Sequence, residues 1–226
     1  MQPAQAQPML DRYLNRRSRL YRFLRPPLPL ITSPSEVFLP ECDGVKLFIG
    51  GAGSNAPASF LNIDLFATSG VNIVADIHSL PFENDSVAAI ECDAVLEHVQ
   101  CPQKAVAECL RVLRPAGFIH IVVPFCHPFH AYPKDYQRWT IDGLKELLQQ
   151  FEVIETGIRT GPTATLLVVL LEYVKLLSPQ PLRRPVYVLC GWLVWPLRYL
   201  DLWLDRKPDA QLLANHVYAL ARKRSD

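Results

Sequence analysis

The sequence carries almost no net charge, since 23 lysines and arginines stand against 22 aspartates and glutamates in 226 residues. It therefore lacks the basic surface that is typical of nucleic-acid-binding proteins. It also lacks a C-x-x-C pair, although it contains six cysteines. Scattered cysteines are typical of reduced, mostly buried thiols in a cytosolic protein, so we predict neither disulfides nor a metal site. The adjacent Cys126 and His127 keep a pair of metal ligands open as the weaker alternative.

The sequence also lacks a stretch of about 20 apolar residues, as a membrane-spanning helix requires, and shows no signal peptide. Its most apolar region is residues 162–206, which contain three of the four tryptophans but are interrupted by charged residues and a proline. We predict that this region forms a hydrophobic helical hairpin lying in a membrane interface. Packing against the sheet or a dimer contact is the alternative.

Residues 11–25 contain six arginines interleaved with leucine and aromatic residues. Such a segment suits an anionic membrane surface, or it is a solvated basic arm without a ligand. Prolines follow it at positions 26, 27 and 29 and end any helix there. We therefore divide the chain into a basic, proline-rich arm (1–35) and one folded domain (36–226) that contains the hairpin at 162–206. The expected location is cytoplasmic, peripheral on the inner face of a membrane.

The chain does contain a glycine turn between two short apolar segments. Residues 45–49 are followed at once by Gly50, Gly51 and Gly53, and the next apolar segment ends at Asp64. Glycine lets the backbone turn sharply and approach a ligand, and one carboxylate can accept hydrogen bonds from both hydroxyls of a ribose. Because ligands of open α/β sheets lie at the carboxyl ends of the strands, the turn predicts a ribose-containing ligand there.

Further apolar segments alternate with helical patterns. We predict strands at residues 45–49, 60–63, 71–74, 87–92, 118–123, 153–158 and 215–221, and helices that begin near Pro102 and after Thr140. Strands that alternate with helices indicate a parallel sheet. The segment 118–123, which is apolar apart from His120, indicates a central strand that is buried on both faces.

These segments resemble a known family. The motifs "LFIGGAGSN", "LNIDLF", "NIVADIHSLPF", "LEHV" and "VLRPAGFIHIVVPF", in this order, resemble the class I S-adenosylmethionine-dependent methyltransferases, most of all the type 11-like members with a short first helix. The resemblance covers about residues 44–151. It implies an α/β, Rossmann-like fold with a seven-stranded sheet whose last strand is antiparallel, and the hydrophobic hairpin is here inserted before that strand.

The resemblance also implies a cofactor, S-adenosyl-L-methionine, and a set of residues that bind it. These residues follow the first four strands: Gly50, Gly51, Gly53, Asp64, Asp76, Ile77, Glu97 and His98. Among them the glycines would lie under the methionine part, Asp64 would hold the ribose hydroxyls, and Asp76 would accept from the adenine amino group. Pro57 stands where many members begin a long helix, so the first helix is expected to be short or missing.

The segment 124–140, "PFCHPFHAYPKDYQRWT", is too polar and aromatic for a plain connection and resembles a stretch of the same methyltransferase group. Methyl transfer to a hydroxyl needs a base, and histidine titrates in the right range. We therefore predict that His127 or His130 is catalytic and that Asp135 orients it. The alternative is that Asp135 pairs with Arg138 and only holds the loop.

The predicted function is S-adenosylmethionine-dependent methylation. The favoured acceptor is an oxygen atom of a membrane-proximal small molecule, saccharide or lipid. Peripheral membrane contact is expected through residues 162–206 and, as an open possibility, through residues 11–25. One alternative is a non-catalytic, membrane-docked nucleotide-binding module. The other is an NAD-dependent oxidoreductase, which the pattern from Gly51 to Ala56 fits in part, although Pro57 and the position of Asp64 argue against it.

Overall fold

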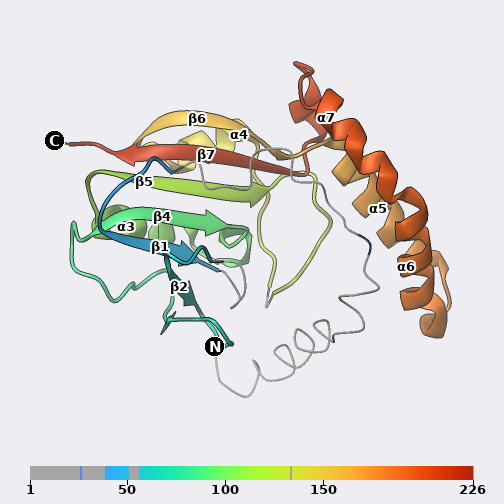
Figure 1. Ribbon diagram of the computed structural model, residues 1–226, viewed down its shortest axis with the longest axis horizontal. Helices are drawn as coiled ribbons and strands as arrows, with labels where there is room; N and C mark the ends of the chain where they lie inside the picture. Colours follow the sequence, from blue (N-terminus) through green and yellow to red (C-terminus); the bar gives the residue numbers. More distant parts are fainter. Residues whose placement is uncertain (1–25, 27–38, 51–55, 133, 226) are drawn as a thin grey trace.

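The computed structural model describes residues 26, 39–50, 56–132 and 134–225, so almost all of the basic arm, as well as Gly51 and Gly53, lies outside the described residues. The described chain forms a seven-stranded sheet in the order β3-β2-β1-β4-β5-β7-β6 (Figure 1). The strands are β1 (Val45–Ile49), β2 (Leu61–Asp64), β3 (Ile73–Val74), β4 (Val87–Asp93), β5 (Leu113–Pro124), β6 (Phe151–Thr160) and β7 (His216–Lys223). Neighbours from β3 to β5 pair in parallel, and β7 runs antiparallel to β5 and β6. The predicted α/β sheet with an antiparallel last strand is confirmed.

The centre of the sheet is formed by β4 and β5, whose side chains are mostly buried. Ile90 of β4 lies beside Ile119 of β5, and Cys92 lies beside Ile121. All four side chains are buried, as expected for strands that are covered on both faces. These residues form the middle of the core and fix the positions of the loops that follow β4 and β5.

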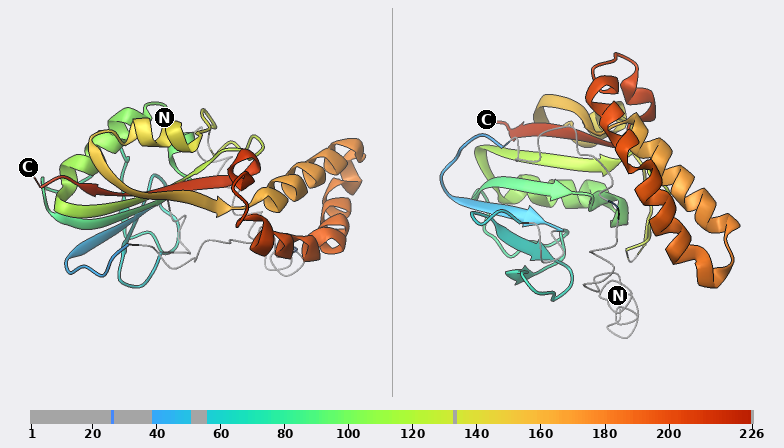
Figure 2. Two further views of the ribbon diagram at one scale, coloured as in Figure 1. Left: turned by 90° about the horizontal axis from the view of Figure 1, so that it is seen from above. Right: turned by 45° about the vertical axis from the view of Figure 1, so that its right-hand side comes forward.

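Two helices cover one face of the sheet (Figure 2, left). They are α3 (Pro102–Val112) and α4 (Ile141–Leu147). α3 buries one apolar stripe, formed by Ala105, Val106, Cys109 and Val112. The Thr140 hydroxyl accepts a hydrogen bond from Gly143 N at 3.0 Å, so this residue is the N-cap of α4 that the sequence predicts.

Two strands begin earlier than predicted. β5 starts at Leu113 rather than at residue 118, because Leu113 is fully buried beside Val87 and α3 has already ended at Val112. Ala116, in the part of β5 between Leu113 and residue 118, has a φ of 60°. This is a left-handed conformation that favours glycine. β6 likewise starts at Phe151 rather than at residue 153, with three residues between it and the end of α4 at Leu147.

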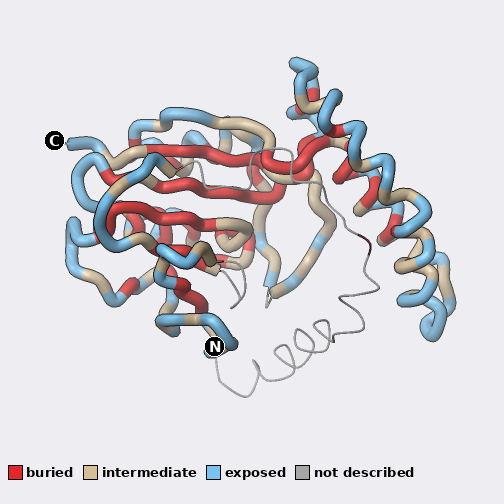
Figure 3. Tube along the Cα trace, in the orientation of Figure 1, coloured by how far each residue is buried: buried red, intermediate tan, exposed pale blue. Residues whose placement is uncertain are grey.

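The predicted hairpin is present as a helical insertion between β6 and β7. Its main helices are α5 (Pro162–Leu177) and α6 (Arg183–Val194), joined by η2 (Gln180–Leu182) and followed by η3 (Trp195–Leu200) and α7 (Asp201–Leu204). The insertion projects beyond the edge of the sheet toward which β4 and β5 run (Figure 1), and most of its surface is exposed (Figure 3). None of the helices in the described part of the chain combines the length and the hydropathy that spanning a bilayer requires.

The base of the insertion is held by Asp201, a fully buried carboxylate. Its oxygens accept hydrogen bonds from Thr163 N at 2.7 Å and Ala164 N at 3.0 Å, so a residue of α7 caps the N-terminus of α5. A Cβ on Gly161 would lie 2.6 Å from the Asp201 side chain, which explains the glycine at this point. Asp201 therefore turns inward and closes the hairpin.

Candidate active site

The carboxyl ends of β1, β2 and β3 lie side by side and carry the predicted cofactor-binding residues that the structure describes. Gly50 follows β1 directly, and its N–H donates to Ile63 O of β2 at 2.9 Å. Its φ of 82° is in the left-handed region, and a Cβ there would lie 2.1 Å from Val95 Cγ2. Only glycine therefore fits at the point where the turn meets the loop after β4.

Asp64 ends β2 and is mostly buried. Its Oδ1 accepts a hydrogen bond from Phe66 N at 3.0 Å, which fixes the side chain against its own turn. Asp76 lies beyond β3 and is about half exposed, with Oδ1 2.9 Å from His78 N and 2.7 Å from His78 Nδ1. Hydrogen bonds from His78 contribute to lowering the pKa of Asp76, against an opposing effect of burial. Asp64 ends β2 and Asp76 follows β3, at the carboxyl ends of these strands, and Ile77 beside Asp76 is buried in the core.

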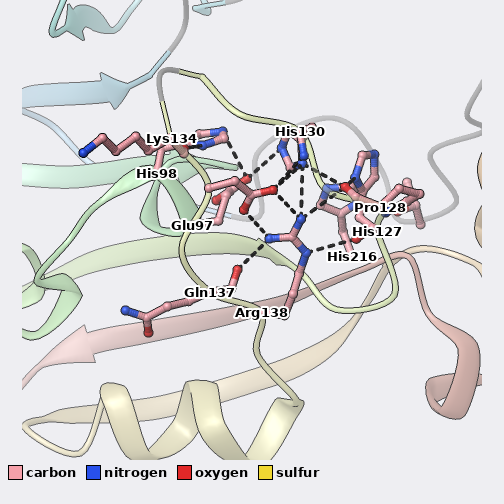
Figure 4. A network of polar contacts seen from close by, with 11 residues as sticks. Glu97, His98, His127, Pro128, His130, Lys134, Gln137, Arg138 and His216 are labelled. Atoms are coloured by element: carbon pink, nitrogen blue, oxygen red, sulfur yellow. Dashed lines mark hydrogen bonds and ion pairs between the residues drawn. The ribbon is translucent and has the colours of Figure 1, made fainter.

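The loop after β4 begins with Val95 and contains the short helix η1 (Leu96–His98). The Glu97 side chain is completely buried, and the His98 side chain is 13% exposed. Figure 4 shows the imidazoles of His98 and His130 on either side of the Glu97 carboxylate. The Nε2 atoms of these two histidines lie 3.8 and 3.4 Å from Glu97 Oε1.

Arg138 organises the loop that follows β5. Its guanidinium donates to the backbone oxygens of His127 (3.0 Å), Pro128 (3.1 Å) and Gln137 (2.8 Å). It also forms two hydrogen bonds with Asp135, one of which has Nη2 2.6 Å from Oδ2. This partner lowers the pKa of Asp135 to about 2. The ion pair that the sequence left open as an alternative is thus present, and it holds the loop in a tight curve.

Asp135 also bonds to the backbone of the histidine that it is predicted to orient. Its Oδ2 accepts from His130 N at 2.7 Å and lies 3.5 Å from His130 Nδ1. His127 donates from Nδ1 to Pro128 O at 2.8 Å, and burial lowers the pKa of its imidazole. The rings of His127 and His130 are 4.5 Å apart between centroids, and His127 is 5.1 Å from His216.

An aromatic contact joins the two halves of the site. The ring of Tyr132 lies 5.9 Å from that of Phe66 and 6.4 Å from that of His98. Phe66 is the residue whose N–H binds Asp64. The loop after β5 therefore reaches across the edge of the sheet, from the histidine cluster to the acid predicted to hold the ribose.

The structure brings the residues predicted to be catalytic, His127, His130 and Asp135, close to Glu97 and His98, which are predicted to bind the cofactor. It adds residues that the sequence did not indicate, namely Phe66, Tyr132 and His216. Their signal was weak because each looks like an ordinary loop or strand residue, and His216 becomes part of the cluster only because β7 lies beside β5. Burial lowers the pKa of His216 to about 3, so its ring is neutral near pH 7.

Comparison with known proteins agrees with this architecture. The family described as "Methyltransferase domain" matches residues 54–121. A 37.1 kDa uncharacterised protein of transposon TN4556 from Streptomyces fradiae is 50% identical over 44 residues, which are 20% of this chain and 13% of that protein, so the match spans a small part of its length.

Solved structures share the fold at low sequence identity. A protein of Galdieria sulphuraria assigned as a sarcosine dimethylglycine methyltransferase has 14% identity and a TM-score of 0.52, over 80% of this chain and 79% of that one. The phosphoethanolamine N-methyltransferase 2 of Haemonchus contortus, in complex with phosphomonomethylethanolamine and S-adenosylhomocysteine, has 15% identity and a TM-score of 0.51, over 82% of this chain and 50% of that one. The family match over residues 54–121 and the order of the sheet make the chain similar to the class I S-adenosylmethionine-dependent methyltransferases.

Proposed function

We propose that this protein transfers the methyl group of S-adenosylmethionine to a hydroxyl oxygen of a small-molecule acceptor that is presented at a membrane. The observation that carries the proposal is the histidine cluster at the ends of β4 and β5 and the start of β7. It is joined through Tyr132 and Phe66 to the acid that ends β2. A proton acceptor thus lies next to the place predicted for the methyl donor.

The described residues fit an adenosyl cofactor. At Gly50 a Cβ would lie 2.1 Å from Val95 Cγ2, so only glycine lets this turn pack against the loop after β4. Asp64 is held by its own turn with Oδ1 against Phe66 N, and this fixes its carboxylate at the sheet edge. S-adenosylmethionine, when bound, supplies a methyl group on a positively charged sulfur. Asp64 then accepts hydrogen bonds from the ribose, and Asp76 accepts from the adenine.

His127 is the base in this proposal. Its Nδ1–H donates to Pro128 O, so the lone pair is on Nε2. Burial lowers its pKa, so the imidazole is neutral and ready to accept a proton near pH 7. The bound cofactor would supply the methyl group to the acceptor oxygen, and His127 Nε2 would take up the hydroxyl proton that this oxygen loses. Asp135 and Arg138 position the loop, and the ring of His130 contacts that of His127.

A small-molecule acceptor is supported by the neighbours of the same fold. The Haemonchus enzyme holds a phosphorylated amino alcohol together with S-adenosylhomocysteine. Its acceptor atom is a nitrogen, whereas we propose an oxygen for this chain. The reason is that a hydroxyl must lose its proton during the transfer, and this site provides a neutral histidine for that step.

Membrane contact is supported by the surface of the insertion. Large apolar side chains there are exposed, among them Leu193 (80%), Leu189 (73%) and Trp203 (60%). Residues 162–206 hold five basic and three acidic residues, and one of the acids, Asp201, is buried. Lys207 lies 4.4 Å above the Trp203 ring, a pairing of aromatic and basic groups that suits an anionic lipid surface. We propose that the insertion docks on such a surface and that the acceptor is a lipid or a saccharide carried by one.

The insertion is also in the right place for this role. Thr160, where β6 ends, lies beside His216 in the register, and Asn215 N donates to Thr160 O at 2.9 Å. The insertion therefore leaves and re-enters the sheet next to His216, whose ring contacts His127. A membrane held by the insertion would lie close to the proposed base.

Titration calorimetry with S-adenosylmethionine tests the cofactor assignment. Asp64→Asn keeps the acceptor for Phe66 N but weakens acceptance of two ribose hydroxyls, so we expect its affinity to fall by more than about tenfold. Asp142→Asn is the control, because its side chain is 95% exposed on α4. Equal affinity in the wild type and Asp64→Asn would refute the placement of the ribose. Binding of NAD in place of S-adenosylmethionine, or of neither, would favour the oxidoreductase or the non-catalytic module.

Vesicle flotation tests the membrane contact, and labelling tests the acceptor. Leu193→Glu should release the protein from anionic vesicles, whereas Ile154→Glu, the same change at an exposed position of β6, should not. Flotation of both variants at the wild-type level would refute the docking surface. Incubation of cell fractions with labelled methyl donor should label the lipid or glycan fraction, and label confined to the protein fraction would refute the acceptor class.

A further inference from the structure

Glu97 is an unusual residue for the interior of a protein. Its side chain is completely buried, and neither carboxylate oxygen has a hydrogen-bond partner among the described residues. Its nearest polar neighbours are the two Nε2 atoms at 3.4 and 3.8 Å, which exceed the usual length of a hydrogen bond. A buried carboxylate is ordinarily paired and hydrogen-bonded or coordinates a metal. The contacts of Glu97 are therefore incomplete in the described chain.

The two neighbouring histidines are each anchored on the side that faces away from Glu97. His98 Nδ1 lies 2.6 Å from Lys134 O, which can only accept a hydrogen bond, so the proton of His98 is on Nδ1. His130 Nδ1 has Pro128 O at 3.3 Å and Asp135 Oδ2 at 3.5 Å as acceptors. Both rings therefore present Nε2 toward the same carboxylate (Figure 4). An acceptor behind the far nitrogen is the typical support of a histidine that ligates a metal.

We propose that Glu97, His98 and His130 bind a divalent first-row transition metal ion. Their ligand atoms all lie within 4.8 Å of one another, so shifts of about 1 Å would bring them to the separation of neighbouring ligands on one ion, whose bonds are about 2.0–2.2 Å long. Two imidazoles and one carboxylate suit zinc, iron or cobalt better than magnesium or calcium, which prefer oxygen ligands. The ion supplies the contacts that the Glu97 oxygens lack.

Three protein ligands leave coordination positions open for a substrate. The His130 side chain is 32% exposed and that of His98 is 13% exposed, so the open positions lie toward the outside of the cluster. An acceptor hydroxyl bound there would lose its proton more readily, and His127, 4.5 Å from His130 between ring centroids, would receive it. The methyl group then passes from sulfur to oxygen. This role of the ion rests on the proposed function, whereas the binding of the ion does not.

Metal titration of the full-length protein, after treatment with a chelator and without cofactor or acceptor, tests the site. We expect the wild type to bind one equivalent of Co²⁺, followed by its absorption, and one of Zn²⁺, followed by competition with a chromophoric chelator. Glu97→Gln and His98→Ala should each weaken binding by about 100-fold or more. Cys126→Ser, which removes a partly buried thiol outside the three ligands, should bind as the wild type does.

Thermal unfolding with and without Zn²⁺ gives a second measurement. A ligand that binds the folded state raises the melting temperature, so the wild type should gain stability with the ion and Glu97→Gln should not. In the absence of metal we expect Glu97→Gln to be at least as stable as the wild type, because the substitution removes a poorly paired buried charge. A less stable Glu97→Gln whose metal affinity equals that of the wild type would show that Glu97 only forms an ion pair with His130, and would overturn the proposal.

The cofactor measurement separates the two proposals. S-adenosylmethionine binding without any metal binding would overturn the ion site and leave the methyl transfer standing. Metal binding that is sensitive to Glu97, in a protein that does not bind S-adenosylmethionine, would support the ion site and overturn the methyl transfer.

Discussion

Gly50→Ala is the substitution that tests the geometry of the site most directly. The residue has a φ of 82°, and its new Cβ would lie 2.1 Å from Val95 Cγ2. A left-handed conformation costs an alanine about 1–2 kcal/mol. Val95 would have to move by more than about 1 Å, and overpacking of this kind costs about 1–3 kcal/mol. We therefore expect a loss of about 2–5 kcal/mol in the free energy of unfolding, measured by urea denaturation.

Gly44→Ala is the matched control, because Gly44 lies just before the same strand and has a φ of 114°. A Cβ there would lie 3.2 Å from Ala88 Cβ, a much milder contact. This variant should lose about 1–2 kcal/mol from backbone strain alone. Gly44 lies at the opposite end of β1 from the proposed cofactor site. The affinity of the Gly44→Ala protein for S-adenosylmethionine should therefore stay within about twofold of the wild type.

The functional effect of Gly50→Ala follows from the residue that it displaces. Val95 immediately precedes η1, which carries Glu97 and His98. We expect the variant to lose more than about tenfold in affinity for S-adenosylmethionine, measured by calorimetry on the folded fraction. Val95→Ala in the same chain should recover the part of the stability lost to overpacking but not the backbone strain, which a double-mutant cycle resolves. Equal stability losses in Gly50→Ala and Gly44→Ala, with unaltered cofactor affinity in both, would refute this reasoning.

Three further predictions concern groups that hold the site and the insertion. Asp201→Asn replaces one hydrogen-bond acceptor at the N-terminus of α5, so it should lower the free energy of unfolding by about 1–2 kcal/mol. It should also speed proteolysis within residues 162–206, and an unaltered cleavage rate would contradict the role of Asp201 as a cap. Burial lowers the pKa of His216 to about 3 from 6.5, so the stability due to its neutral ring is complete above about pH 6.5 and is lost as the pH falls toward 3. His216→Asn should therefore reduce the slope of the free energy of unfolding against pH between pH 6.5 and 5. One titrating group contributes at most ~1.4 kcal/mol per pH unit to this slope. Equal slopes in the wild type and His216→Asn would contradict the prediction. Arg138→Lys loses the paired hydrogen bonds to Asp135. It should slow turnover by about tenfold or more without changing the affinity for S-adenosylmethionine. Full turnover in this variant would show that the loop does not need these hydrogen bonds.

The sheet could be predicted from the sequence because its strands are marked locally. The central segment of β5 is apolar apart from His120, and the short apolar segment of β2 ends on a carboxylate. The boundaries were less accurate, since Leu113 looks equally suited to the face of α3 and to the start of β5. Packing beside Val87 decides between these two, and that contact does not appear in the order of the residues.

The parts that the sequence did not predict depend on contacts between distant segments. Asp201 looks like one position of a solvated stripe, and it becomes a cap only because α7 folds back 38 residues to the start of α5. His216 looks like the end of a strand. The absence of a metal site was predicted from the spacing of the cysteines, whereas the ligands that we propose are a glutamate and two histidines on two different loops.

The order of the strands explains how donor and acceptor could meet. The residues predicted to bind the cofactor lie at the ends of β1, β2 and β3, on one side of the sheet, and the insertion leaves from β6 and returns to β7, on the other side. Between them lie the ends of β4 and β5, with the histidine cluster. β6 runs parallel to β5, because both are antiparallel to β7, so its end at Thr160 lies at the same edge as Pro124. A methyl donor bound at one end of this edge and an acceptor brought by the insertion from the other would therefore approach each other at His127, and neither would have to pass across the core.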